Sequence, residues 1–312
     1  MFHLIKPNTR INFLGQRYIA FAFSIIMVVM SIGSLAIQGL ALDVDFTGGV
    51  VLEVGYQQPV ELDDVRQTLA DEGYSDARVQ FFGSTTDIMI RLGPQETEDT
   101  QAVSDAILKA LQVDNADAEM RRVEFVGSQV SGELVTKGGL ALLYTMIGIM
   151  IYVMFRFQWK LSVGAVVSLL HDVVIVTGLF SLFQWKFDLT VLAALLAILG
   201  YSVNDTIVIF DRQRENYRRL RKADTFEVMN VSINETLSRT ILTVLSTMLA
   251  LLALLFVGGD AVFWFALAMF IGCILGTYSS VYIAIAIALQ FKLTREDIYP
   301  PKEDEETGHA HP

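Results

Sequence analysis

The chain has 312 residues, of which 53% are hydrophobic and 18% are charged, and its mean hydropathy is +0.47. A soluble domain of this length would carry more charge, so the composition excludes an ordinary water-soluble globular protein. The formal net charge is −11, and the single cysteine, Cys273, excludes an intrachain disulfide.

Six apolar stretches with little or no charge are each long enough to cross a bilayer. About 20 helical residues cover a hydrocarbon core of ~30 Å. The predicted spans are 18–42, 138–155, 161–185, 189–210, 240–259 and 261–291. Basic residues precede the first span, as in a signal peptide, but its apolar stretch is too long for one and indicates a retained anchor. The sequence therefore predicts an α-helical polytopic membrane protein with six transmembrane helices.

Residues 43–137 form an acidic segment between the first two spans, with 19 acidic and 7 basic residues. Its patterning predicts strands at 50–54, 77–82, 87–92 and 120–126 and helices at 62–71 and 100–111. This order is that of a split β-α-β arrangement. We therefore expect an inserted α+β ferredoxin-like domain, with another small α/β arrangement as the alternative. Its acidity argues against nucleic acid as a partner.

The short connections are basic, which marks the cytoplasmic side of a membrane protein. Arginine and lysine gather between the second and third spans and between the fourth and fifth. We expect residues 1–17, the loop 211–238 and the tail 292–312 in the cytoplasm, and residues 43–137 outside. The arginine-rich part of the loop fits either an interfacial flank or a contact with membrane lipid or a partner. The charged tail is predicted to be disordered, and its two histidines, His309 and His311, are weak support for a metal site.

A carboxylate lies within the fourth span, where lipid is expected. Asp205 follows Asn204, and a carboxylate at the bilayer centre costs at least ~2.5–3.5 kcal/mol on insertion scales. Such a residue normally faces the interior of a helix bundle. Gly200 and Asn204, like Ser202 and Thr206, are four residues apart and share helix faces. The fourth span is therefore predicted to carry a polar stripe.

The third span has a polar pair of its own near its middle, His171 and Asp172. Gly164, Ser168 and Asp172 follow at steps of four, which places them on one face. The pair fits either a mutually satisfied buried contact or part of a proton relay. Polar stripes on consecutive spans predict a shared polar seam.

Arg239 begins the fifth span, where an arginine either reaches the lipid head groups or pairs with a carboxylate. A carboxylate desolvated in a bundle can bind and release a proton near neutral pH, and a nearby arginine opposes protonation. Movement of Asp205 relative to Arg239 would thus couple protonation to helix displacement. In the sixth span, Gly272 and Gly276 have the G-x-x-x-G spacing that permits close helix contact. Helix packing alone explains the glycine, serine and threonine positions.

Five stretches together are similar to a known family. They are D-F-T-G-G at 45–49, V-G-S-Q-V-S at 126–131, H-D-V at 171–173, L-G-Y-S-V-N-D-T-I-V-I-F-D-R at 199–212, and S-R-T at 238–240. One span, a large external domain and then five spans resemble half of an RND-type fold. More specifically, residues 15 to about 293 resemble the SecD–SecF family of bacterial protein export.

This resemblance implies a Sec translocase component that uses the proton motive force, without a further cofactor or metal, to promote late preprotein translocation. It implies an obligate heterodimer with SecD in the inner membrane, a periplasmic inserted domain, and contacts with SecYEG, SecA, YajC, YidC and the translocating preprotein. The carboxylate at Asp205 and the arginine at Arg239 match the family's proton-linked residues. Asn204, His171 and Asp172 are further candidates for the relay.

Three other functions stay open. A small-solute/proton antiporter half of the RND superfamily would need a second half, for example by dimerisation. An intramembrane hydrolase would need a signature such as H-E-x-x-H, G-x-S-x-G or a glycine-lysine phosphate loop, and the sequence has none of these. An assembly scaffold would not depend on Asp205. We therefore expect a transport component and not an enzyme.

Overall fold

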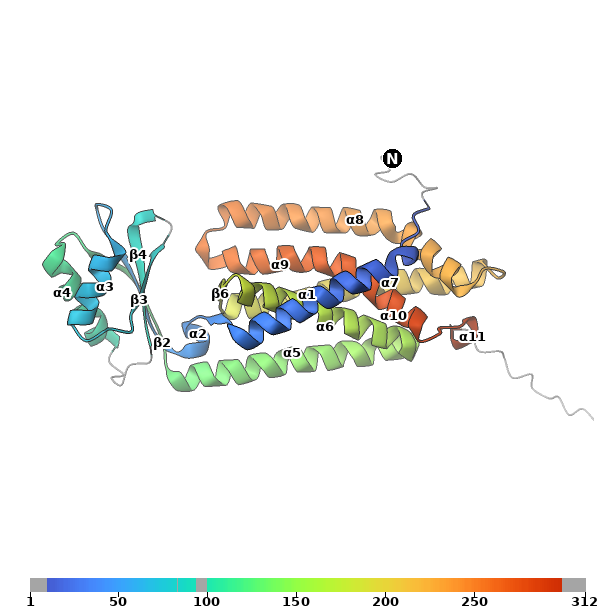
Figure 1. The fold of residues 1–312 in the computed structure, drawn as a ribbon, viewed down its shortest axis with the longest axis horizontal. Helices are drawn as coiled ribbons and strands as arrows, with labels where there is room; N and C mark the ends of the chain where they lie inside the picture. Colours follow the sequence, from blue (N-terminus) through green and yellow to red (C-terminus); the bar gives the residue numbers. More distant parts are fainter. Residues whose placement is uncertain (1–9, 83, 94–99, 299–312) are drawn as a thin grey trace, which may run out of the picture. The chain divides into compact units, whose positions relative to one another are not determined.

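The computed structural model describes residues 10–82, 84–93 and 100–298 (Figure 1). The chain forms two compact units. The membrane unit contains the residues up to Gly39, Leu142–Gln184 and the residues from Ala193 onward, and the inserted unit contains Leu40–Ala141 and Trp185–Leu192. The tail beyond Ile298, with His309 and His311, lies outside the described residues.

Six helices are long and apolar enough to cross a membrane. Their elements are α1 (Arg17–Ile37, after a short 3-10 turn η1, Leu14–Gln16), α5 (Ser128–Arg156), α6 (Trp159–Leu182), α7 (Leu189–Arg219), α8 (Thr225–Val257) and α9 (Asp260–Ser279). The last helix continues through a π-helical segment, η2 (Ser280–Ala284), into α10 (Ile285–Gln290), and α11 (Arg295–Ile298) follows. The chain is therefore a membrane protein, as its hydropathy predicts.

Several helix boundaries differ from the sequence prediction, including the start of α5 at Ser128 instead of residue 138. The first helix ends at Ile37 instead of continuing to residue 42, because Ala41 and Leu42 form a short strand, β1 (Ala41–Leu42). The expected cytoplasmic loop 211–238 is mostly helical, since α7 continues to Arg219 and α8 begins at Thr225. Between residues 211 and 238, charged residues end the apolar signal without ending α7 or delaying the start of α8.

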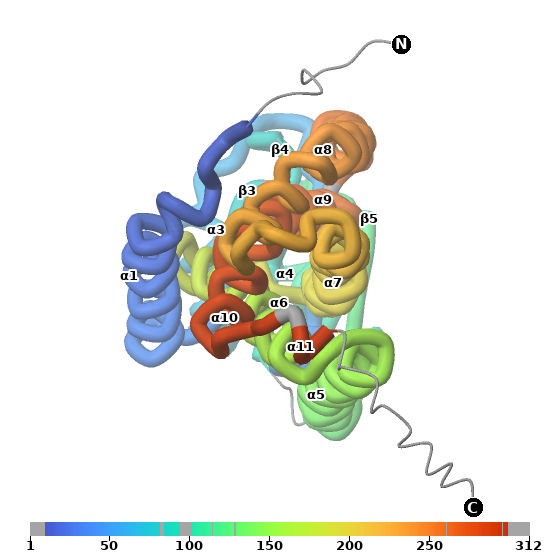
Figure 2. The backbone as a smooth tube through the Cα atoms, turned by 90° about the vertical axis from the view of Figure 1, so that its right-hand side faces the viewer, coloured from blue at the N-terminus to red at the C-terminus, as the bar shows by residue number. Residues whose placement is uncertain are grey.

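Small residues bring the helices of the membrane unit close together. An added Cβ at Gly178 of α6 would lie 2.1 Å from Ser31 of α1, and one at Gly272 of α9 would lie 2.4 Å from Ile198 of α7. Gly276 faces Ser202 in the same way, at 3.0 Å. The G-x-x-x-G prediction for α9 is thus confirmed as a contact with α7. Viewed along the helices, α1 lies at the rim of the group, next to α6 (Figure 2).

The inserted domain follows the predicted order of strands and helices. These elements are β2 (Gly49–Gly55), α3 (Leu62–Asp71), β3 (Arg78–Phe82), β4 (Ser84–Leu92), α4 (Thr100–Asp114) and β5 (Glu119–Val126). The sheet has the order β3-β4-β2-β5, and all its pairings are antiparallel. Alternate residues of the central strands, such as Leu52 and Ile90, are fully buried against Leu69 of α3 and Ile107 of α4. Strand, helix, strand, strand, helix, strand in this sheet order is a split β-α-β topology.

A second, two-stranded sheet lies in the same unit. Strand β1 pairs in parallel with β6 (Lys186–Phe187), which precedes α7. After β1, the short helix α2 (Val44–Thr47) ends at Gly48 and Gly49, with φ of 72° and 119°. An added Cβ at Gly49 would lie 2.1 Å from the Leu92 carbonyl oxygen. The glycine pair therefore permits both the backbone turn and the close approach of β4.

Substitution Gly49→Ala should destabilise the chain by about 3 kcal/mol, because it adds backbone strain and a steric clash. Gly39→Ala is the matched control, since Gly39 also has a positive φ of 68° but has no atom within 4 Å of an added Cβ. It should cost about 1–2 kcal/mol. Thermal unfolding of the purified variants in detergent measures both, and equal losses would contradict the close approach at Gly49.

Candidate functional site

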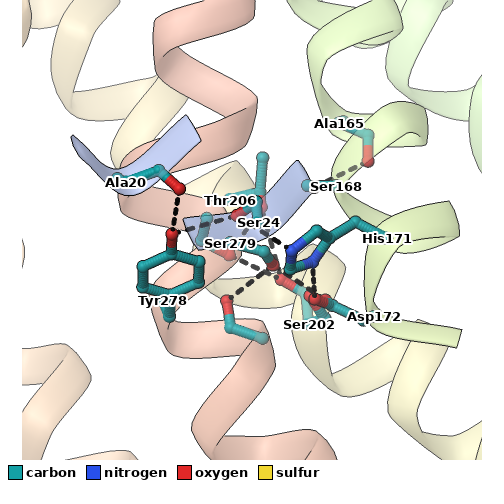
Figure 3. A network of polar contacts seen from close by, with 12 residues as sticks. Ala20, Ser24, Ala165, Ser168, His171, Asp172, Ser202, Thr206, Tyr278 and Ser279 are labelled. Atoms are coloured by element: carbon teal, nitrogen blue, oxygen red, sulfur yellow. Dashed lines mark hydrogen bonds and ion pairs between the residues drawn. The ribbon is translucent and has the colours of Figure 1, made fainter. Parts of the chain in front are cut away.

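The Asp172 carboxylate of α6 lies at the centre of a buried polar network (Figure 3). The residue is fully buried. Its Oδ2 atom accepts hydrogen bonds from the Ser202 hydroxyl of α7 at 2.7 Å and from the Ser279 hydroxyl of α9 at 2.8 Å. A buried carboxylate needs such donors, because a desolvated charge without partners is strongly unfavourable.

His171 extends this network to α1. Its Nδ1 atom lies 3.1 Å from Asp172 Oδ1, and its Nε2 atom lies 3.1 Å from the Ser24 hydroxyl. The Ser24 hydroxyl is 2.9 Å from the Tyr278 hydroxyl, which in turn donates to the Ala20 carbonyl oxygen at 2.7 Å. Ser24, His171, Asp172, Ser202, Tyr278 and Ser279 are called the polar seam below.

The directions of these hydrogen bonds determine how many protons the polar seam holds. Tyr278 has one hydroxyl proton and donates it to Ala20, so Ser24 donates to Tyr278. The Ser24 oxygen must then accept a hydrogen bond from the N–H at His171 Nε2. The contact between His171 Nδ1 and Asp172 Oδ1 needs one more proton, because otherwise both atoms would be acceptors. His171 and Asp172 therefore share one proton, as an imidazolium with a carboxylate or as an imidazole with a carboxylic acid.

A second set of hydroxyls connects α7 to the irregular part of the last span. The Thr206 and Ser280 hydroxyls are 2.8 Å apart, and Ser280 also donates to the Ser202 carbonyl oxygen at 3.3 Å. Ser280 is the first residue of the π-helical segment η2. Such segments are rare and often occur at functional sites.

Asp205 lies one helical turn after Ser202 on α7 and is 5% exposed. Within the described part of the chain, its Oδ2 atom has no hydrogen-bond partner, and no ion pair joins it to Arg239. Arg239 still acts on it by electrostatic attraction. Asp205 is thus a buried carboxylate whose interactions are incomplete in this arrangement.

The five residues predicted for the proton relay do not all lie in one network. The structure brings His171 and Asp172 together in the polar seam, whereas Asn204 and Arg239 are exposed and lie outside it. Both side chains therefore lie on the surface of the membrane unit. The proton role of these residues stays a prediction.

A charged cluster lies where α7 and α8 continue beyond the predicted spans. Glu235 of α8 accepts hydrogen bonds from Arg212 at 2.8 Å and Asn216 at 2.8 Å, and also from Arg219, all on α7. The arginines predicted to lie in a loop thus pair with the facing helix.

A second charged cluster is in the inserted unit, at the start of α7. Asp43 forms ion pairs with Arg91 of β4 at 3.1 Å and with Lys186 of β6 at 2.8 Å. Asp45 accepts a hydrogen bond at 3.0 Å from the backbone N–H of Leu189, the first residue of α7. Burial raises the pKa of Asp45, the Leu189 N–H opposes this effect, and the carboxylates of Asp43 and Asp188 add to it. The strand β4 and the N-terminus of α7 are therefore held by one set of charges.

Sequence reasoning missed Ser24, Tyr278 and Ser279 of the polar seam. One signal was present, because Thr277, Tyr278, Ser279 and Ser280 are four consecutive polar residues in an otherwise apolar span. Ser24 gave no comparable signal, since a lone serine in a first span resembles any helix-packing residue.

The fold and the polar seam define a polytopic membrane protein with an α+β domain inserted after its first helix and ionisable groups buried in its bundle. Two family models match the chain. One, described as protein export membrane protein SecD/SecF, C-terminal, covers residues 106–294, and the other, the SecD/SecF GG motif, covers residues 33–60. The chain belongs to the SecD/SecF family of protein export membrane proteins.

Curated relatives and solved structures agree with this assignment. The protein translocase subunit SecF of Pseudomonas aeruginosa is 50% identical over 298 residues, covering 96% of each chain. That of Escherichia coli O157:H7 is 39% identical over 297 residues, covering 95% of this chain and 92% of the relative. The crystal structure of SecDF from Thermus thermophilus matches with a TM-score of 0.83 and 35% identity over 93% of this chain. The chain spans 40% of that SecDF chain.

Removal of the central carboxylate by Asp172→Ala should destabilise the membrane unit by about 3–5 kcal/mol, because His171, Ser202 and Ser279 lose their common acceptor. Asp172→Asn should cost less, since its amide oxygen still accepts hydrogen bonds. Asn204→Ala is the control on an exposed position and should change stability by less than about 0.5 kcal/mol. Unfolding midpoints of the purified variants test this order, and an Asp172→Ala midpoint like that of Asn204→Ala would contradict the network.

Proposed function

We propose that the chain is a membrane subunit of protein export that works with a SecD partner and uses the proton motive force. In this role it assists the SecYEG channel and the SecA ATPase at a late stage of preprotein translocation. Family membership supports the export role, and the buried, incompletely bonded carboxylate of Asp205 supports the proton role.

Two protonation states of Asp205 would favour different positions of α7. A neutral Asp205 is stable in an apolar bundle, whereas an ionised one attracts Arg239 on α8 or must reach water. The membrane potential contributes about 2.3 kcal/mol per charge per 100 mV. Proton uptake and release at Asp205 would then alternate the packing of α7 against its neighbours.

The charges at the start of α7 offer a mechanical connection to the external domain. Asp45 binds the first N–H of α7, and Asp43 joins Lys186 to Arg91 on the central part of the sheet. Strands β1 and β6 add backbone pairing at the same place. A displacement of the first residues of α7 would therefore act directly on Asp45.

The proposed export role also implies which proteins the chain binds and in which membrane it lies. The SecDF chain is longer than this one, which supports an obligate SecD partner that supplies the other half. YajC, YidC, the translocating preprotein and membrane lipid are the further expected contacts. The chain would lie in the inner membrane with cytoplasmic termini and a periplasmic domain, and ATP hydrolysis would belong to SecA.

Asp205→Asn should keep assembly with SecD but reduce translocation to the level measured without a proton motive force, because an amide cannot exchange the proton. The measurement is preprotein transport into inverted vesicles or proteoliposomes at a defined proton motive force. Asp211→Asn is the matched control, since Asp211 is on the same helix but is exposed and paired with Arg156. Full stimulation in the Asp205→Asn complex would rule out the proton role.

Single cysteines at Ser84 and Thr225 should react with membrane-impermeant reagents from opposite sides of the membrane. Ser84 begins β4 of the inserted domain and Thr225 begins α8. The native Cys273 is fully buried and serves as the unreactive background. Labelling of intact spheroplasts and of inverted vesicles gives the two sides, and reaction of both positions from one side would refute this orientation.

A further inference from the structure

Two amide side chains on α7 are fully buried with unused hydrogen-bonding groups. Gln213 and Asn216 are both 0% exposed. Both amide atoms of Gln213 and the Oδ1 atom of Asn216 have no hydrogen-bond partner among the described residues. Buried polar atoms in proteins are nearly always bonded, to protein or to ordered water. These groups therefore point to a ligand that the protein's own side chains do not supply.

The two amides continue the line of Asp205 along the helix. Asn216 follows Asp205 by eleven residues, about three helical turns, so the two side chains leave α7 in nearly the same direction. Gln213 lies between them, one turn before Asn216. The separation along the axis from Asp205 to Asn216 is about 16 Å.

A pocket of about 430 Å³ lies beyond Asn216. Arg219 and Glu235 line it, together with residues of the N-terminal segment and of the first turns of α8. Glu235 also accepts the hydrogen bond from Asn216 at 2.8 Å, so Asn216 is joined to the wall of this pocket. The charged lining suits water, and Asn216 lies one hydrogen bond from it.

Water fits these groups better than an organic ligand does. An amide presents both a donor and an acceptor, and a buried water needs two to four polar partners. Ile209, 1% exposed, occupies the turn between Asp205 and Gln213. An apolar side chain at this position separates the carboxylate from the amides in this arrangement.

We propose that Gln213 and Asn216 hold water molecules that form the route by which a proton passes from Asp205 to the cytoplasm, with Ile209 as its barrier. This inference rests on the proposed function, because it takes Asp205 as the proton site. Gln213 and Asn216 would be positioning residues for water, and the proton would pass along the water molecules to the pocket at Glu235.

The main test replaces the amide by an apolar group of similar size. Gln213→Leu, in complex with SecD, should reduce both proton flux in dye-loaded proteoliposomes and proton-driven translocation to the level of Asp205→Asn. Gln213→Glu should retain both, since a carboxylate can still bind water. Gln290→Leu is the matched control, because Gln290 is exposed at the end of α10 and should behave like the unmodified chain.

A gain of function tests the barrier. Ile209→Ser should increase proton leak across the vesicle membrane when no preprotein is present, because a hydroxyl extends the water route to Asp205. Combining it with Gln213→Leu should abolish the extra leak. Unchanged leak in Ile209→Ser, or normal flux in Gln213→Leu, would overturn the route. If Asp205→Asn itself retains full stimulation, the proposed function fails instead.

Hydroxyl-radical footprinting of the intact complex detects bound water without relying on transport. Tyr217 follows Asn216 and is 3% exposed, so its oxidation on the millisecond timescale would report water held beside it. Tyr56 is the control, a tyrosine 6% exposed in the core of the inserted domain. Oxidation of Tyr217 well above that of Tyr56, and its loss in Gln213→Leu, is expected. Equal, low oxidation of both tyrosines would refute bound water at this site.

Discussion

The burial of the Asp172 carboxylate is the constraint on which the arrangement of the membrane unit depends. Hydrocarbon offers no hydrogen-bond donor, so every donor must come from a neighbouring helix. Ser202 and Ser279 reach the carboxylate only because α7 and α9 approach closely, and Gly276 permits that approach by facing Ser202 without a side chain of its own. Small residues and polar groups therefore require each other here: the glycine contact without the carboxylate would lack specificity, and the carboxylate without the contact would lack its donors.

The two buried carboxylates of the bundle have different environments, although they are close in the fold. Asp172 has three polar partners and shares a proton with His171, whereas one oxygen of Asp205 lacks a partner in the described structure. A carboxylate whose oxygens all accept hydrogen bonds is held in place, because any movement breaks several of these bonds. A carboxylate with an oxygen that accepts none can bind a proton or an approaching cation without breaking a hydrogen bond. The polar seam is thus suited to hold the helices together, and Asp205 is suited to respond.

Much of this organisation was predictable from the sequence, for reasons specific to the lipid environment. Six apolar stretches identified the spans, and alternation within residues 43–137 identified the strands and helices of the inserted domain. Asp205, His171 and Asp172 stood out because ionisable groups are costly in lipid. Tyr278 and Ser24 did not, since their role comes from a contact between residues 254 positions apart. The residues assigned to a cytoplasmic loop at 211–238 are mostly helical, because the apolar periodicity ends before the helices do, while Arg212 and Arg219 stabilise the helical continuation by pairing with Glu235.

The pairing of β1 with β6 also bears on the order in which the protein can be made. The inserted domain's own sheet is complete once Val126 has been synthesised, because all four of its strands precede that point. The contact between Asp45 and Leu189 is not yet formed at that point. This hydrogen bond closes a loop of 144 positions that contains α5 and α6. Closing so long a loop becomes favourable only after these two helices have been inserted and their ends are held near each other. The four-stranded sheet can therefore form early, whereas the contact between Asp45 and Leu189 forms only after the third span has been made.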